Sequence, residues 1–198
     1  MCKKCYKFAE FTRGKLCFKC GKIQCICHAR ELHFDYAAAP FIYSGDIRIS
    51  ILKLKEYKHF SLSQGFVYYM LPLIMEFPDF DVIDMITPVP LYKSRKNQRG
   101  YNQSEILAYN LSKNLNIKMQ KDVIKKIKDT GIQHELKAQE RKYNLLNAFS
   151  VNKKLSKGKN ILLVDDVMTT GETFNECAKE LKKAGANKIY CIAVATTV

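Results

Sequence analysis

The sequence predicts an α/β fold in which a mainly parallel central sheet is flanked by helices, with a small cysteine-rich module in front. From residue 36 onward, apolar strand-like segments alternate with amphipathic stretches, as in a parallel sheet covered by helices. Six of the eight cysteines lie within the first 27 residues. Four apolar residues, 161–164, lead directly into Asp165, Asp166 and a Thr-Gly turn, an order typical of a central strand whose carboxyl end binds a ligand.

The length and composition indicate one main domain with an appendage. A chain of 198 residues, of which 47% are hydrophobic, can bury one α/β core. We expect a cysteine-rich module at 1–33 and the main domain at 34–198, because the first segment has no periodic apolar face and needs a cross-link. The formal net charge of +14 indicates an anionic partner, either a small diphosphate or a nucleic acid, although a generally Lys-rich surface would give the same charge.

The first two elements of the main domain follow from short apolar patterns. Residues 36–44, YAAAPFIYS, predict a strand. Residues 46–57 predict a helix with Asp46 near its start. The same segment could form a strand instead, because its apolar residues partly alternate at positions 47, 49, 51 and 52.

Residues 61–76 predict a second helix, which carries the most hydrophobic run of the chain, 66–77. This run is short and contains Pro72, and no stretch of about 18 apolar residues occurs elsewhere, so we expect no transmembrane segment. Peripheral contact with a membrane stays open. Residues 82–90 predict a strand that ends in a turn stiffened by prolines.

The second half of the domain continues the alternation of strands and helices. Residues 104–115 are expected to be helical, because apolar residues 106, 107, 111 and 115 fall on one face. The polar segment 129–145 stays unassigned. The remaining expected elements are strands at 122–127, 159–166 and 188–198, and a helix at 172–185 that Gly185 ends.

The segment ILLVDDVMTTGET, 161–173, has the order of residue types that a ribose phosphate requires. The carboxylates of Asp165 and Asp166 can hold ribose hydroxyls or a water bound to Mg²⁺. The turn that follows can direct backbone N–H groups and Thr hydroxyls at a phosphate, Gly171 permits close approach, and the helix N-terminus adds a favourable field. The alternative is an ordinary capped helix whose polar residues satisfy only its own backbone donors.

A basic segment about 65 residues upstream suits a diphosphate. The turn at Val89-Pro90 ends a strand and could approach a pyrophosphate closely. A basic loop that ends at Gly100 could then close over the departing diphosphate and stabilise its charge. A solvated basic loop is the alternative. The cations of this loop are Lys93, Arg95, Lys96 and Arg99.

Segment 161–173 closely resembles the loop of type I phosphoribosyltransferases that binds 5-phosphoribosyl 1-pyrophosphate (PRPP). The motifs PVPL, RGYNQSEILA and QERKYNLLNAF (139–149) resemble the ComF family, phosphoribosyltransferase-like proteins associated with DNA uptake in natural competence. The resemblance covers nearly the whole chain, including the cysteines. It implies a type I phosphoribosyltransferase fold, similar to that of amidophosphoribosyltransferases, with an N-terminal zinc finger.

The resemblance also implies ligands, partners and site residues. Mg²⁺ is expected with PRPP, and Asp165, Asp166 and Arg99 are the expected catalytic residues. A role in competence implies contact with single-stranded DNA, a DNA-translocating helicase as partner, and a cytoplasmic location that extends to the inner membrane. The residues expected to bind PRPP are Val89, Pro90, Lys93, Arg95, Arg99, Val164, Asp165, Asp166, Met168, Thr169, Thr170, Gly171, Glu172 and Thr173.

Turnover of PRPP stays open at this point. A PRPP-sensing or DNA-binding adaptor would use the same residues, whereas a nucleobase salvage enzyme needs a base pocket for which the sequence offers no set. His134, Glu135 and Tyr101 are candidate acids or bases, although a lone His in a polar loop is more often solvated. Aromatic residues interleaved with lysines suit single-stranded DNA, although core packing is their commoner role. These residues are Lys53, Lys55, Tyr57, Lys58, Phe60, Tyr92 and Tyr101.

The paired cysteines predict a structural zinc site. Cys2 and Cys5 form one CxxC pair, Cys17 and Cys20 form another, and four thiolates from two such pairs can close a tetrahedral site. A closed site carries no catalysis, and the metal would supply most of the folding energy of this module. Any of the neighbouring ligand-type residues could replace one of the four, namely Cys25, Cys27, His28 or His33.

Overall fold

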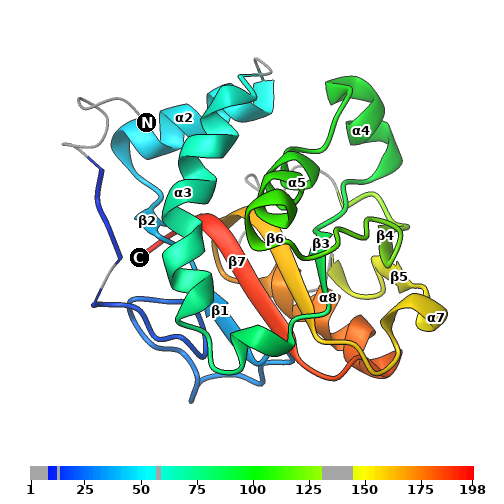
Figure 1. The fold of residues 1–198 in the computed structure, drawn as a ribbon. Coiled ribbons are helices and arrows are strands. Elements are labelled where there is room, and N and C mark those ends of the chain that lie inside the picture. The colour runs from blue at the N-terminus through cyan, green and yellow to red at the C-terminus, as the bar shows by residue number, and fades with distance from the viewer. Residues whose placement is uncertain (1–8, 13, 57–58, 131–144) are drawn as a thin grey trace.

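The computed structural model describes residues 9–12, 14–56, 59–130 and 145–198, and its centre is a parallel sheet (Figure 1). The strand order is β1-β7-β6-β3, and β2 pairs with β7 beyond the end of β1. All of these pairings are parallel. The strands are β1 (Tyr36–Ala38), β2 (Phe41–Ile42), β3 (Met85–Pro88), β6 (Ile161–Met168) and β7 (Ile189–Thr196).

Helices cover both faces of the sheet (Figure 1). On one face, α2 (Gly45–Glu56), α3 (Ser61–Met75) and α5 (Gln103–Leu115) pack into one hydrophobic core. On the other face, α8 (Glu172–Lys183) and the antiparallel pair β4 (Ile124–Lys126) and β5 (Phe149–Val151) form a second core. The remaining elements are η1 (Phe80–Val82), α4 (Lys93–Arg99) and α7 (Lys153–Ser156).

The central strand β6 belongs to both cores because its side chains alternate between the two faces of the sheet. Leu162 and Val164 enter the core beneath α3 and α5, whereas Ile161 and Leu163 enter the core beneath α8. All four are fully buried, which explains why the strand is a continuous apolar run. This burial fixes the strand and places Asp165 and Asp166 near its carboxyl end.

Most expected elements are present, with differences at their ends. The segment at 46–57 is a helix, α2, and the alternative strand is wrong. The expected strand 36–44 is divided into β1 and β2 around Pro40. Strand β6 continues past Asp166 to Met168, because Val167 and Met168 still pair with Ala195 and Thr196 of β7.

The basic segment 93–99, expected as a loop, is the short helix α4. It follows Tyr92 in extended conformation and ends at Gly100, whose φ of 83° only glycine adopts readily and whose N–H donates to Lys96 O. The unassigned segment 129–145 lies largely outside the described residues. None of the helices that the structure describes is long and apolar enough to cross a membrane.

The N-terminal segment from residue 9 to 33 lies against the main sheet. Phe11 forms a bridge with Phe41, and Phe18 O accepts a hydrogen bond from Ala37 N at 2.8 Å. The Phe18 ring packs edge-on against Phe77, with ring centroids 6.0 Å apart. The described part of the cysteine-rich segment is therefore packed on the domain through aromatic contacts and backbone hydrogen bonds.

Candidate functional site

A cavity of about 730 Å³ opens where β3 and β6 end. Both sequence motifs reach it, although they lie far apart along the chain. Of the residues expected to bind PRPP, the cavity is lined by Val89, Pro90, Arg95, Arg99, Asp165, Asp166, Met168, Thr169, Gly171 and Thr173. The other four, Lys93, Val164, Thr170 and Glu172, do not line it.

Two adjacent carboxylates form one wall of the cavity. Asp165 Oδ1 accepts hydrogen bonds of 2.9 Å from Ser104 Oγ and from the backbone N–H of Asp166. Burial and, after it, the charge of the neighbouring Asp166 raise the pKa of Asp165 to about 7, against the opposing effect of those hydrogen bonds. The site therefore holds a carboxyl group that changes its charge close to neutral pH.

Lys55 of α2 supplies the counter-charge. Its Nζ lies 2.8 Å from Asp166 Oδ2, and both side chains are largely buried. Burial opposes the ammonium charge, but Asp166 and Asp165 outweigh it, so the pKa of Lys55 is raised. The sequence grouped Lys55 with lysines and aromatic residues whose interleaving suits single-stranded DNA, but its side chain is largely buried against Asp166. It lies on the stripe of α2 that contains Ile47, Ile51 and Leu54, and a lysine on an apolar stripe signals a buried acidic partner.

The RGYNQSE motif, residues 99–105, connects the turn after β3 with the carboxylates of β6. Asn102 caps α5 by accepting from Ser104 N at 3.1 Å, and its Nδ2 donates to Val89 O at 2.9 Å. Ser104 Oγ then reaches Asp165, so the turn after β3 and the carboxylate of β6 are tied to one helix end. Sequence reasoning used this motif as a resemblance only and missed the role of Asn102 and Ser104.

The turn between β6 and α8 is held from the side of the N-terminal segment. Lys22 Nζ donates to Thr169 O at 2.9 Å, and Arg30 Nη2 donates to Thr170 O at 2.6 Å. Arg30 also pairs with Glu172. Gly171 precedes α8 with a φ of 78°, a conformation that favours glycine. We call residues 169–173 the phosphate loop.

Helix α4 brings cations to the opposite side of the cavity. Arg95 and Arg99 line the cavity, and Arg99 Nη1 donates to Gln103 Oε1 at 2.6 Å. Lys96 does not line it and instead pairs with Glu105 at 2.7 Å. The cavity thus has carboxylates, a loop beside a helix N-terminus, and two guanidinium groups, a combination suited to a sugar that carries phosphates.

Residues 102–198 match the phosphoribosyl transferase domain family, and this stretch contains Ser104, both carboxylates and the phosphate loop. This part of the chain is a phosphoribosyl transferase domain. The fold is accordingly of type I, with a parallel central sheet flanked by helices.

Two known proteins with similar sequences are named for competence and for DNA utilization. The chain is 44% identical over 108 residues to competence protein F of Haemophilus influenzae, which covers 54% of this chain and 47% of that protein. It is 38% identical over 111 residues to the DNA utilization protein YhgH of Escherichia coli, 55% of this chain and 48% of that protein. The chain is a homologue of both, and its match spans about half the length of each.

Among solved structures, glutamine PRPP amidotransferase from B. subtilis has a TM-score of 0.44 and 17% identity, covering 66% of this chain and 26% of that one. The assignment of the phosphoribosyl transferase domain rests on the sequence match and the sheet, not on this likeness.

Four cysteines in front of the phosphoribosyl transferase domain form a cluster that could hold a metal such as zinc. The Sγ atoms of Cys17, Cys20, Cys25 and Cys27 all lie within 4.8 Å of one another. Cys17 Sγ lies 3.7 Å from Cys27 Sγ and 3.6 Å from Cys25 Sγ. Zinc with Zn–S bonds of about 2.3 Å in a tetrahedron requires S–S distances of about 3.8 Å, so the cluster fits this ion.

The expected zinc ligands are thus partly present in this cluster. Cys17 and Cys20 belong to it, while Cys2 and Cys5 lie outside the described residues. Cys25 and Cys27, which the sequence left as replacements, complete the set of four. Burial raises the pKa of Cys17, but hydrogen bonds from the Cys20 backbone and the Cys25 thiol outweigh it and lower the pKa to about 7.

The candidate acids and bases are not assembled in the described part of the site. The Tyr101 hydroxyl donates to Leu54 O, and Tyr101 does not line the cavity. Its ring packs edge-on against Phe60 at 5.1 Å, so Phe60 has a packing role although 44% of it is exposed. His134 and Glu135 lie outside the described residues, as do Tyr57 and Lys58.

Proposed function

We propose that the chain binds Mg-PRPP in the cavity between α4 and the phosphate loop and acts in the handling of incoming DNA. The observation that carries this proposal is that one cavity joins the buried Asp165-Asp166 pair, the start of α8 and the guanidinium groups of Arg95 and Arg99. PRPP has a ribose, a 5′-phosphate and a diphosphate, and the cavity offers one type of partner for each.

In this proposal, each wall binds one part of PRPP. Asp165 and Asp166 accept hydrogen bonds from the ribose hydroxyls. The phosphate loop takes the 5′-phosphate through its N–H groups and the Thr hydroxyls. Arg95 and Arg99 take the diphosphate beside the turn at Val89-Pro90.

Magnesium fits this site as a companion of the diphosphate. Asp166 is already paired with Lys55, and Asp165 already accepts two hydrogen bonds, so the carboxylates do not form a cage for a resident ion. Mg²⁺ usually keeps several waters and binds through phosphates with one or two carboxylates, which suits such a site. When bound, the ion neutralises diphosphate charge.

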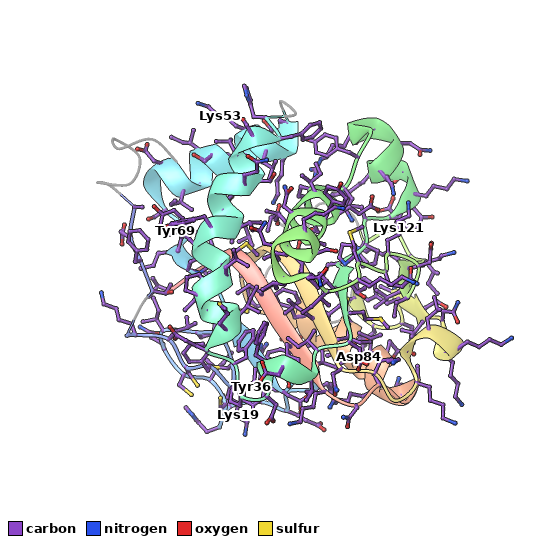
Figure 2. The ribbon with its side chains drawn as sticks, in the orientation of Figure 1. Lys19, Tyr36, Lys53, Tyr69, Asp84 and Lys121 are labelled. Atoms are coloured by element: carbon purple, nitrogen blue, oxygen red, sulfur yellow. The ribbon has the colours of Figure 1, made fainter. Side chains whose placement is uncertain are left out.

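A role in natural competence is the biological setting that the relatives support. The two relatives are named competence protein F and DNA utilization protein, and the net charge of +14 favours an anionic polymer as partner. We propose contact with single-stranded DNA in the cytoplasm, next to the inner membrane, with a DNA-translocating helicase as partner. Lys53 is exposed at the edge of α2 and is available for such contact (Figure 2).

If the domain catalyses transfer, the bond between the anomeric carbon and the diphosphate oxygen breaks, its electron pair leaves with pyrophosphate, and an acceptor lone pair forms the new bond. Arg95 and Arg99 would stabilise the departing charge. A non-catalytic PRPP sensor is the second candidate, because no described residue of the expected acids and bases lines the cavity.

Calorimetric titration of Mg-PRPP into wild type and an Asp165→Asn, Asp166→Asn double variant tests the binding proposal. Wild type should bind, and the double variant should bind at least about 100-fold more weakly, because two charge-assisted hydrogen bonds to ribose are lost. Equal affinities would overturn the assigned site. Pyrophosphate release with single-stranded DNA as acceptor then separates enzyme from sensor, since a sensor binds PRPP without releasing pyrophosphate.

We also propose that the N-terminal module, 1–33, carries a structural zinc ion in front of the domain at 34–198. The geometry of the four clustered cysteines supports zinc, and Cys2 and Cys5 are the competing ligands from the sequence. Zinc content of two double variants decides between the sets. If the cluster is the site, Cys25→Ser with Cys27→Ser removes zinc, and Cys2→Ser with Cys5→Ser retains it. The reverse result would restore the two CxxC pairs.

A further inference from the structure

The turn between β6 and α8 has three successive carbonyl groups that all have partners behind the cavity. Met168 O accepts from Thr196 Oγ1 at 3.1 Å and from Thr197 N at 3.3 Å. Thr169 O accepts from Lys22 Nζ at 2.9 Å, and Thr170 O accepts from Arg30 Nη2 at 2.6 Å. Two of the three carbonyls are thus held by cations of the N-terminal segment.

These contacts fix the direction of the N–H groups in the same turn. The described peptide bonds are all trans, and in a trans peptide the C=O and the N–H point to opposite sides. When the carbonyls of residues 168, 169 and 170 point towards β7 and the N-terminal segment, the N–H groups of Thr169, Thr170 and Gly171 point the other way. Thr169 and Gly171 line the cavity on that other side.

The side chain of Lys22 is buried and hydrogen-bonded in this position. It is 7% exposed, and its Nζ also donates to Thr197 Oγ1 at 3.0 Å and to Thr197 O. Its own carbonyl accepts from Cys17 N at 3.0 Å, within the turn that carries Cys17 and Cys20. A buried ammonium that reaches oxygen atoms of both β7 and the phosphate loop is costly to place, and its hydrogen bonds offset that cost.

We propose that Lys22 and Arg30 are positioning residues of the phosphate site, which orient three N–H groups of the phosphate loop towards the 5′-phosphate of the ligand. In this proposal, the N-terminal segment contributes to ligand binding by orienting the phosphate loop. This inference rests on the proposed function, because it names how the phosphate side of the PRPP site is organised. Neither residue touches the ligand; they act through the backbone of residues 169–171.

Two ligands that each carry one end of PRPP test this role. Ribose 5-phosphate depends on the phosphate loop, whereas Mg-pyrophosphate depends on Arg95 and Arg99. For Lys22→Met, we expect the dissociation constant of ribose 5-phosphate to rise about tenfold while that of Mg-pyrophosphate stays unchanged. Lys19→Met is the matched control, because this exposed lysine lies in the same turn and points away from the body of the protein (Figure 2).

Arg30→Lys is the second variant, which keeps the charge but loses the planar fork that reaches both Thr170 O and Glu172. It should also weaken ribose 5-phosphate and spare Mg-pyrophosphate, and it stands as the test if Lys22→Met does not fold. Amide hydrogen exchange of residues 169–171 should be faster in both variants than in Lys19→Met.

The outcomes separate the two proposals. A wild type that binds Mg-PRPP and ribose 5-phosphate, with both variants unchanged, overturns the positioning role alone. An equal loss of both ligands in Arg30→Lys also overturns it, because a general loss of structure does not distinguish the phosphate end. A wild type that binds neither PRPP nor ribose 5-phosphate overturns the proposed function, and the positioning role with it.

Discussion

The two sides of the cavity are built in different ways. The phosphate loop is held by carbonyl contacts to Lys22, Arg30 and the end of β7, and it leads into the buried face of α8. Helix α4 on the other side has no buried residue. Its side chains make polar, partly exposed contacts, which include Lys96 with Glu105, Arg99 with Gln103, and Ser94 with Asp129.

This difference indicates that the two sides of the cavity contribute differently to stability and to ligand affinity. A site whose dipoles are fixed before the ligand arrives costs stability in the free protein and loses little entropy on binding. The phosphate side has that character. The diphosphate side is anchored by one ion pair and two hydrogen bonds that are partly exposed, and such contacts contribute little to stability. Changes in the phosphate loop should therefore alter both stability and affinity, whereas changes on α4 should alter affinity alone.

The largest expected effect comes from Gly171→Ala. Gly171 has a φ of 78°, and an added Cβ would lie 2.9 Å from Arg30 Nη2. The methyl group should displace the guanidinium and turn the Thr170 carbonyl, so we expect affinity for Mg-PRPP to fall at least about 100-fold, together with about 1–2 kcal/mol of stability. Calorimetry and urea unfolding measure the two effects.

Gly158→Ala is the matched control for the backbone strain alone. Gly158 also has positive φ, 71°, but an added Cβ there would meet nothing within 4 Å. It should lose about 1 kcal/mol of stability and keep its affinity for PRPP. If both variants bind PRPP like wild type, the idea of a fixed phosphate side is wrong.

The second-largest effect is expected on stability, from a change in the carboxyl pair that lies between the two sides of the cavity. Burial, followed by the charge of Asp166, raises the pKa of Asp165 from 3.8 to about 7. Between these values the native state holds a proton that the unfolded state has released, so stability falls as pH rises through this window. Asp165→Asn removes the buried charge. It should therefore be more stable than wild type by about 2 kcal/mol near pH 8, and by much less near pH 4.5.

Asp84→Asn is the control of opposite sign. Asp84, labelled in Figure 2, directly precedes β3, whose opposite end borders the cavity, and a backbone hydrogen bond from Asn160 lowers its pKa. A lowered pKa stabilises the native state above the unfolded value, and this stabilisation is lost on acidification. Asp84→Asn should thus be less stable than wild type near neutral pH. Unfolding curves at several pH values measure both variants, and a pH-independent effect of Asp165→Asn would show that its carboxyl does not titrate in this range.

The sequence predicted the sheet and the turn from strand to helix at 169–173, because both depend on local order. Buried parallel strands are continuous apolar runs, and Asp165, Asp166 and Gly171 follow such a run directly. The contacts that organise the site were not predictable in this way. Lys22 and Thr169 are separated by 147 positions, and nothing in the local pattern of either residue specifies the other.

Lys55 and Ser104 show an intermediate case. Their positions carry a signal, because Lys55 falls on an apolar stripe of α2 and Ser104 follows the cap residue Asn102. The sequence pattern indicates that each side chain has a polar partner. The structure shows that the partners are Asp166 for Lys55 and Asp165 for Ser104. Segment 93–99 was expected to be a loop and is the helix α4. Its seven residues lack an apolar stripe, which is the main sequence sign of a helix.

The smallest effect should come from α4, and it separates two cations of one helix. Arg99 lines the cavity, whereas Lys93, also expected to bind PRPP, does not. Arg99→Met should raise the dissociation constant of Mg-PRPP about tenfold, and Lys93→Met less than about twofold, because of these two residues only Arg99 is placed to make the proposed charge-assisted contact with diphosphate. Neither variant should change the melting temperature. Equal losses would mean that α4 moves to bring Lys93 to the ligand, and a loss of stability in Arg99→Met would mean that this side is also fixed before binding.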